Sequence, residues 1–102
     1  MKEIERLKAM LEGADIPFEY DENGDICFSA QLCYPENTVE KRVCSVIQNC
    51  YSYGGEENLL EIAGLLTDEE KETDEVAGWL SAEQVFNRIK RHWELKGSTA
   101  RT

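Results

Sequence analysis

The stretch from Val43 to Leu66, VCSVIQNCYSYGGEENLLEIAGLL, constrains the fold more than any other part of the chain. Residues 43–47 are nearly continuously apolar and rich in β-branched side chains, which is typical of a central or fully covered strand. The Gly54-Gly55 pair permits a tight turn, because glycine adopts backbone conformations that are closed to other residues. Glu56 and Glu57 suit the first turn of a helix, and the wide apolar stripe that follows predicts a helix over 56–66 that packs back on the strand.

The first half of the chain predicts a helix followed by the rest of a small antiparallel sheet. Apolar residues at spacings of three and four over 2–13 indicate an amphipathic helix. Alternating apolar and polar residues over 16–21 indicate a half-buried strand, and the Asn23-Gly24 pair is a strong hairpin signal. We expect the return strand over 25–34 and a third strand over 39–48.

The C-terminal part predicts helices that cover this sheet. The sequence Thr-Asp-Glu-Glu at 67–70 is typical of a helix cap and first turn, and an acidic loop is the alternative. Residues 74–80, DEVAGWL, are expected to return to the core with Trp79 buried. The Ser81-x-x-Gln84 pattern is a capping box, and the apolar residues over 82–93 follow a helical period.

These elements predict a two-layer α+β domain in the order α-β-β-β-α-α. It would have an N-terminal helix, a three-stranded antiparallel sheet and C-terminal helices. The length of 102 residues suits one core. We expect a single domain over 1–96 and a flexible tail over 97–102, which is small and polar.

The composition also predicts where the protein works. No apolar run approaches the roughly 20 residues that a membrane span needs, so we expect no membrane association. The charged amphipathic start of the chain indicates that there is no signal peptide. Four cysteines without a signal peptide predict reduced thiols and a cytoplasmic protein.

Negative charge is concentrated over residues 56–75. The formal net charge of the chain is −10, and this segment carries nine carboxylates against Lys71, a net −8. Because nucleic-acid binding depends on neutralising phosphates, we do not expect direct binding of nucleic acid. The charge would favour a basic protein partner, or serve solubility alone. The candidate partner-binding carboxylates are Glu56, Glu57, Asp68, Glu69, Glu70, Glu72, Asp74 and Glu75.

Two further surfaces are candidates for partner binding. The turn over 51–55 resembles a phosphate-binding loop in outline only, because it lacks the Gly-Lys-Ser/Thr ending of that motif. Tyr51 and Tyr53 would offer a large, low-entropy contact area to a protein, although one of them packing inward is an open alternative. A basic helix face would hold an acidic partner or the 56–75 segment of a second copy, unless it is simply solvated. Its residues are Arg88, Arg91 and His92.

No set of residues indicates catalysis or a bound metal. The cysteines at 27, 33, 44 and 50 are separated by five, ten and five residues, whereas zinc ligands usually pair two to four residues apart. Small buried side chains are the favoured account of these cysteines. His92 has no identifiable orienting residue for a role as a catalytic base, and no segment matches the twelve-residue calcium loop. We therefore expect no enzyme, no metal and no cofactor.

The region from Val43 to Ile89 resembles a family of small uncharacterised proteins encoded by phages and prophages of Gram-positive gut bacteria. The resemblance lies in SYGGEENLLEIAGLLTDEE and in the later pattern DxVxGWLxAExVFxRI. It implies a mobile-element protein in the cytoplasm of a bacterial host, and it carries over no activity, cofactor or site residue.

The leading functional hypothesis is a small acidic, non-enzymatic phage accessory protein that acts by binding. Its target would be a basic host protein of a nucleic-acid-processing defence system, such as a CRISPR system, whose nucleic-acid channel the carboxylates would occupy as phosphates do. A homo-oligomeric sponge for a nucleotide signal is the first alternative, with phosphate and base contacts from Arg88, Arg91, His92 and the tyrosine loop. A structural or regulatory phage component is the second.

Overall fold

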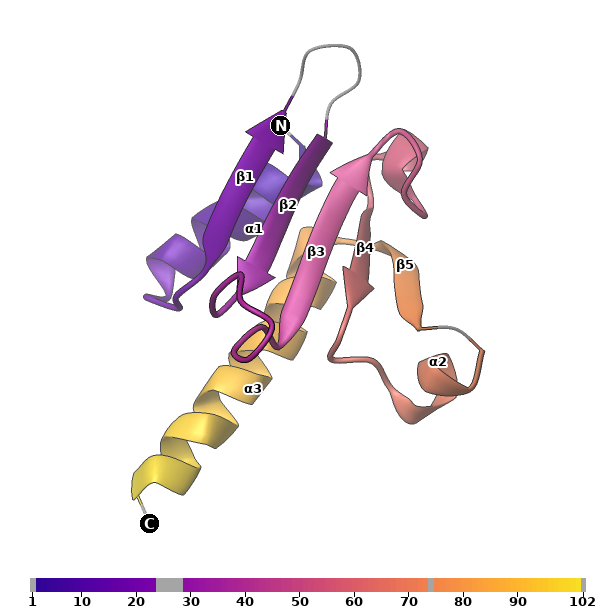
Figure 1. Cartoon of the computed structure of the whole chain (residues 1–102). Coiled ribbons are helices and arrows are strands. Elements are labelled where there is room, and N and C mark those ends of the chain that lie inside the picture. Colours follow the sequence, from indigo (N-terminus) through magenta and orange to yellow (C-terminus); the bar gives the residue numbers. More distant parts are fainter. Residues whose placement is uncertain (1, 24–28, 74, 102) are drawn as a thin grey trace.

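The computed structural model describes residues 2–23, 29–73 and 75–101 (Figure 1). The elements are α1 (Glu3–Gly13), β1 (Glu19–Asn23), β2 (Ser29–Tyr34), β3 (Cys44–Asn49), the 3-10 turn η1 (Gly55–Glu57), β4 (Leu60–Ala63), α2 (Asp68–Thr73), β5 (Val76–Leu80) and α3 (Ala82–Arg101).

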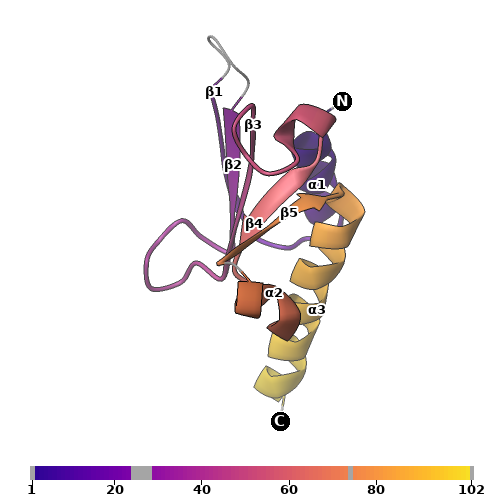
Figure 2. The ribbon, with the colours of Figure 1, turned by 90° about the vertical axis from the view of Figure 1, so that its right-hand side faces the viewer.

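The strands form one antiparallel sheet in the order β1-β2-β3-β4-β5. Helices α1 and α3 cover one face of it, as the two views show (Figures 1 and 2). The prediction of a two-layer α+β domain with an N-terminal helix and C-terminal helices is therefore confirmed. The predicted sheet of three strands is wrong, because the described chain has five.

The two additional strands are β4, in a segment predicted to be a helix, and β5, in the segment predicted only to return to the core. Over 60–63 the buried Leu60 and Ile62 alternate with the more exposed Glu61 and Ala63, which is the period of a strand. The predicted helix over 56–66 is therefore wrong, because η1 and β4 occupy this segment. The strand is only four residues long, so its apolar stripe fits a helical period as well as a strand period. Segment 76–80 then pairs with β4 as β5.

The N-terminal predictions are closer to the structure. Helix α1 matches the expected segment, and β1 begins at Glu19, three residues later than the alternation suggested. The third strand begins at Cys44, and Val39, which was expected to open it, is exposed. The expected hairpin pair lies partly outside the described residues, which end at Asn23 and resume at Ser29.

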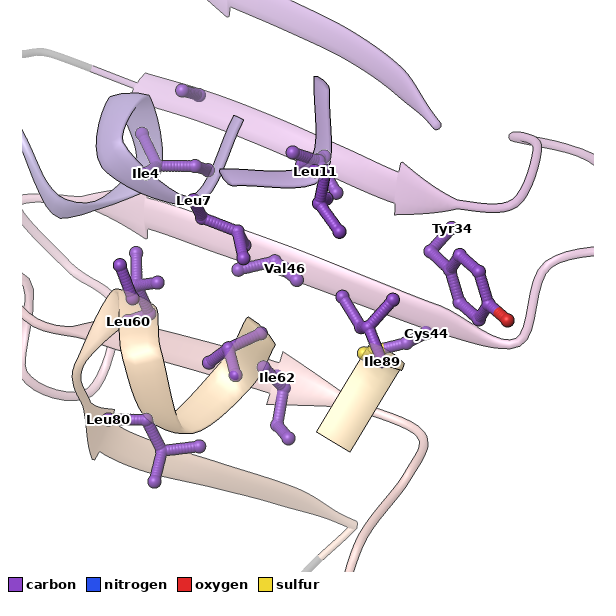
Figure 3. Packing of buried hydrophobic residues seen from close by; sticks show 14 of the residues in the cluster. Ile4, Leu7, Leu11, Tyr34, Cys44, Val46, Leu60, Ile62, Leu80 and Ile89 are labelled. Carbon is purple, nitrogen blue, oxygen red and sulfur yellow. The ribbon is translucent and has the colours of Figure 1, made fainter. Parts of the chain in front are cut away.

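The core lies between the helices and the sheet. Ile4, Leu7 and Leu11 are fully buried on the side of α1 that faces Val46 of β3 (Figure 3). Burying side chains of this size contributes roughly 1.5–3 kcal/mol each. Ile89 of α3 completes the core from the other helix. These contacts fix both helices on one face of the sheet and leave its other face without a helix in the described part of the chain.

A network of polar side chains caps the N-termini of α1 and α3. The side-chain oxygen of the buried Gln48 accepts a hydrogen bond from the Ile4 amide at 3.0 Å. The side-chain oxygen of Asn58 accepts a hydrogen bond from the Glu3 amide, also at 3.0 Å. In return, the Glu3 carboxylate accepts from the amide of Ala82, the first residue of α3, at 2.6 Å. Each helix start, which would otherwise expose unpaired amides, is satisfied by a distant segment.

The C-terminal helix begins as expected. The Ser81 hydroxyl accepts from the Gln84 amide at 3.2 Å, and the Gln84 side chain accepts from the Ser81 amide at 2.8 Å, which confirms the capping box. Helix α3 continues to Arg101 and thus includes most of the segment that was expected to be a flexible tail. Among the described residues, none of the helices is long and apolar enough to cross a membrane.

The cysteines follow the sequence prediction only in part. Cys33 and Cys44 are free and buried, as expected for small core side chains. Cys50 instead lies exposed in the turn after β3 and is disulfide-bonded, so the prediction of reduced thiols is wrong for this residue. Cys27 lies outside the described residues. The proposed cytoplasmic location loses the support that it drew from reduced thiols, because disulfides persist in oxidising compartments.

Candidate protein-binding site

An exposed pair of stacked aromatic rings lies where the turn after β3 meets β5. The rings of Tyr53 and Trp79 are 5.5 Å apart between centroids and inclined by 14°. The two residues remain 47% and 56% exposed, and neighbouring Tyr51 is 92% exposed. Single exposed aromatic residues are ordinary on protein surfaces, but a cluster of three marks a candidate interaction surface.

A β-bulge turns Trp79 outward. Leu80 pairs with Leu60 and Ala77 pairs with Ile62, so Gly78 and Trp79 together stand opposite the single residue Glu61. In a regular strand Trp79 would face the same side as buried Ala77. The extra residue reverses this side, as bulges do. The prediction of a buried Trp79 is therefore wrong, and the glycine before it is the sequence signal that indicates a bulge.

The backbone at Trp79 is held in an unfavourable conformation. Its φ angle is 55°, in the left-handed region that bulky side chains avoid. Such a residue costs roughly 1–3 kcal/mol and persists only where its surroundings impose it. Here the Trp79 amide donates to the Tyr53 carbonyl at 3.2 Å, which ties the bulge to the turn.

Two glycines allow the turn to lie directly against β5. A Cβ atom added to Gly54, whose φ is 89°, would lie 2.8 Å from the Trp79 Cα, and one added to Gly78 would overlap the Tyr53 Cβ. Both positions therefore require glycine for close approach. The Glu61 carboxylate also accepts from the Tyr53 amide at 2.8 Å. The aromatic pair thus stands on a closely packed backbone.

A shallow hollow of about 260 Å³ opens beside these rings. This aromatic hollow is smaller than the roughly 300–1,000 Å³ of most small-molecule sites, and suits a single side chain. No cationic side chain lines it among the described residues, and Glu56 and Glu57 take part in none of the described ion pairs. The lining residues are Cys50, Tyr51, Ser52, Tyr53, Gly54, Glu56, Glu57 and Trp79.

The expected acidic segment does not form one continuous surface. Glu56 and Glu57 lie on η1, before β4, whereas α2 follows β4, so the two groups lie at opposite ends of that strand (Figure 1). Asp74 lies outside the described residues, and Glu75 precedes β5. The remaining predicted carboxylates are on α2, namely Asp68, Glu69, Glu70 and Glu72.

At the α2 end, the expected acidic and basic surfaces meet within one molecule. The Arg88 guanidinium donates to the two carboxylate oxygens of Glu70 at 2.7 and 3.0 Å, and to the Leu65 carbonyl at 3.0 Å. The hydrogen bond from Arg88, followed by that from the Thr67 amide, lowers the pKa of Glu70 to about 2. Arg88 therefore fixes α2 against α3, and neither charge is free for a partner.

The other basic-face residues are also separated from the hollow. The Tyr34 hydroxyl and the His92 Nδ1 are 2.7 Å apart and hydrogen-bonded, with the rings edge to face at 5.5 Å. Burial, followed by the nearby Cys44, raises the pKa of Tyr34. His92 thus serves a core contact. Arg91 is exposed on α3, and none of the three basic residues lines the hollow at Tyr51 and Tyr53.

The described nucleophilic and metal-ligating side chains do not indicate a catalytic or metal site. In the ranges that the structure describes, no group of three or more His, Cys, Asp or Glu side chains is placed to hold a metal ion. Burial raises the pKa of Cys44 to about 12, so its thiol stays protonated near neutral pH. The expectation that the protein is not an enzyme stays a prediction.

No protein-family model, curated protein or solved structure matches this chain. The resemblance to phage-encoded proteins therefore stays a prediction.

Proposed function

We propose that this protein acts without catalysis, by binding a basic segment of a protein partner in the aromatic hollow. The observation that carries the proposal is the exposed Tyr53–Trp79 stack beside two unneutralised carboxylates, Glu56 and Glu57. Aromatic residues in a pocket are the side chains that most often dominate the energy of protein interfaces. The carboxylates supply electrostatic complementarity to a basic segment.

The strain at Trp79 supports a role for this surface beyond stability. A buried tryptophan would contribute to folding, but this one is half exposed in a disfavoured conformation. A glycine would fit the same backbone at less cost. The fold therefore keeps a large aromatic ring on its surface against the local preference of the chain, which is typical of a functional site.

The net charge of −10 favours approach of a basic partner before contact is made. A basic nucleic-acid-binding host protein is the partner class that we propose, in keeping with the phage-like context of the sequence. Because the carboxylates are split between η1 and α2, the proposed contact is one compact hollow. A continuous imitation of a phosphate backbone receives no support from this arrangement.

The test compares partner capture by matched variants. Three purified proteins are immobilised and exposed to a bacterial host lysate. They are the wild type, a hollow variant that combines Trp79→Gly with Glu56→Gln and Glu57→Gln, and the control variant Asp68→Asn/Glu69→Gln. Quantitative mass spectrometry should identify basic proteins held by the wild type and the control and lost by the hollow variant. Equal recovery of the same proteins on all three would contradict the proposal.

No observation favours the alternative functions. A nucleotide sponge would need Arg88 and His92 to be free for phosphate, whereas they bond Glu70 and Tyr34. A structural or regulatory phage component stays an alternative prediction, as does self-association.

A further inference from the structure

We infer that the aromatic hollow is a site for an arginine side chain of the partner, and that it prefers a guanidinium group to an ammonium group. This inference rests on the proposed function and adds the chemical identity of the ligand. In the proposed complex, the guanidinium plane stacks on the exposed ring of Trp79, and its N–H groups donate hydrogen bonds to Glu56 or Glu57.

The geometry of the rings favours a planar cation. Tyr53 and Trp79 are nearly parallel and stacked, and each residue is still about half exposed to solvent. Aromatic cages recognise quaternary ammonium groups, and the lysine ammonium is a compact, strongly hydrated charge, whereas the planar, weakly hydrated guanidinium group stacks flat on a single ring. A parallel pair presents a flat platform and not a cage.

The carboxylates stand on a backbone that the turn fixes in place. Gly54 and Asn58, at the two ends of η1, both have left-handed conformations, with φ angles of 89° and 59°. The Gly54 carbonyl accepts from the Glu57 amide at 3.0 Å and from the Leu59 amide at 2.9 Å. Two carboxylates that line the same hollow as Trp79 are thereby carried on a fixed backbone, where a guanidinium with five donors can bond to them and stack on the ring at once.

The size and charge of the hollow exclude other ligands. Its volume of about 260 Å³ admits one long side chain. Phosphate-bearing ligands, including nucleotides, would meet two carboxylates without a cation among the described lining residues. The negative charge that repels an anion from the hollow attracts a basic side chain to it.

The test uses two twelve-residue Gly/Ser peptides that carry three arginines or three lysines at the same positions. The chain has two tryptophans, so in a Trp93→Phe background Trp79 is the single fluorescent reporter. We expect the arginine peptide to quench Trp79 and to bind at least about fivefold more tightly than the lysine peptide, as the stacking energy implies. Calorimetry measures the same affinities independently of fluorescence.

Matched variants locate the contact. Glu56→Gln/Glu57→Gln should weaken the arginine peptide about tenfold, since both acceptors lose their charge. Asp68→Asn/Glu69→Gln removes the same charge from α2 and should change the affinity less than twofold, apart from a weak long-range effect. An equal loss in the two double variants would show that net acidity alone holds the peptide, and would overturn the inference.

The outcomes also separate this inference from the proposed function. Equal affinity for the two peptides, with loss in the hollow variant only, would overturn the guanidinium preference and leave a site for basic segments. Absence of binding by both peptides in calorimetry would overturn the inference and the proposed function together.

Discussion

Acidic residues lie at both ends of β4, two on η1 and four on α2, but their surroundings differ. At the α2 end, Glu70 is bonded by Arg88 on both carboxylate oxygens and is part of the packing between helices. At the η1 end, Glu56 and Glu57 border the aromatic hollow and take part in none of the described ion pairs. The same residue type stabilises the fold at one end and is free to bind at the other.

This difference shows that the number of carboxylates in a segment does not locate a binding surface. What separates the two ends is the neighbouring residues, namely a cation on α3 at one end and two exposed rings at the other. If this distinction is right, changes at the α2 end should alter stability and leave binding intact. Changes of the side chains that line the hollow should weaken binding and leave stability nearly unchanged.

The largest effect is expected where the hollow depends on its backbone. Gly78→Ala would place a methyl group against the Tyr53 Cβ and 2.9 Å from the Tyr53 carbonyl oxygen. Displacing the turn from β5 should lower the free energy of unfolding by about 3 kcal/mol, as overpacking does. Urea denaturation measures this, with Gly13→Ala as the control, because its added methyl group would meet nothing within 4 Å. Equal stability of the two variants would show that the turn is not packed as described.

Removing the exposed ring should separate binding from stability. Trp79→Gly loses the stacking with Tyr53, worth about 0.5–1.5 kcal/mol, but relieves the disfavoured φ of 55°, which returns a similar amount. The free energy of unfolding should therefore change by less than about 1 kcal/mol. Binding of a basic peptide should fall by about 30-fold, the effect of a hot-spot residue. A large loss of stability with unchanged binding would assign Trp79 to the fold alone.

At the opposite end, Arg88→Ala should weaken the fold without affecting the hollow. It removes charge-assisted hydrogen bonds to Glu70 and to the Leu65 carbonyl. The expected loss is about 2 kcal/mol in the free energy of unfolding, with the peptide affinity unchanged within twofold. The exposed Arg91, changed to alanine, is the matched control and should alter the stability by less than about 0.5 kcal/mol. A reduced peptide affinity in Arg88→Ala would mean that the two ends are coupled.

A smaller effect should appear as a dependence of stability on pH. The pKa of Glu70 is lowered to about 2 in the folded protein, so its ionised form stabilises the fold above its ordinary value of 4.5. That contribution, about 1 kcal/mol for a partly exposed pair, is lost as the pH falls from 4.5 towards 2. The difference in unfolding free energy between wild type and Glu70→Gln, measured at pH 6 and at pH 2.5, should therefore shrink. A constant difference would show that the ion pair contributes nothing.

The features that could be predicted from the sequence are those that depend on residues close together in the chain. The first helix follows from its apolar spacing, and the start of α3 follows from Ser81 and Gln84, which bond each other. Segment 59–66 lacks such a signal, because its apolar residues fit a strand and a helix equally well. Only its pairing with β3 and β5 decides the outcome.

The candidate site was predicted in part for the same reason. Tyr51, Tyr53, Glu56 and Glu57 lie in one turn, and their proximity is visible in the sequence. Trp79 joins them only because a bulge in β5 is tied to the Tyr53 carbonyl. The helix-capping roles of Glu3 and Gln48 were missed because their partners are 79 and 44 residues away in the chain.

The bulge at Trp79 has one more consequence, for the behaviour of the protein at high concentration. β5 is the last strand of the sheet, and such an edge offers unpaired backbone groups to strands of other molecules. Here the Trp79 amide already donates a hydrogen bond to the Tyr53 carbonyl. The irregular register of β5 also interrupts the regular series of backbone hydrogen bonds that an added strand would need. The distortion that displays the ring therefore also makes this edge a poorer template for a strand of another molecule.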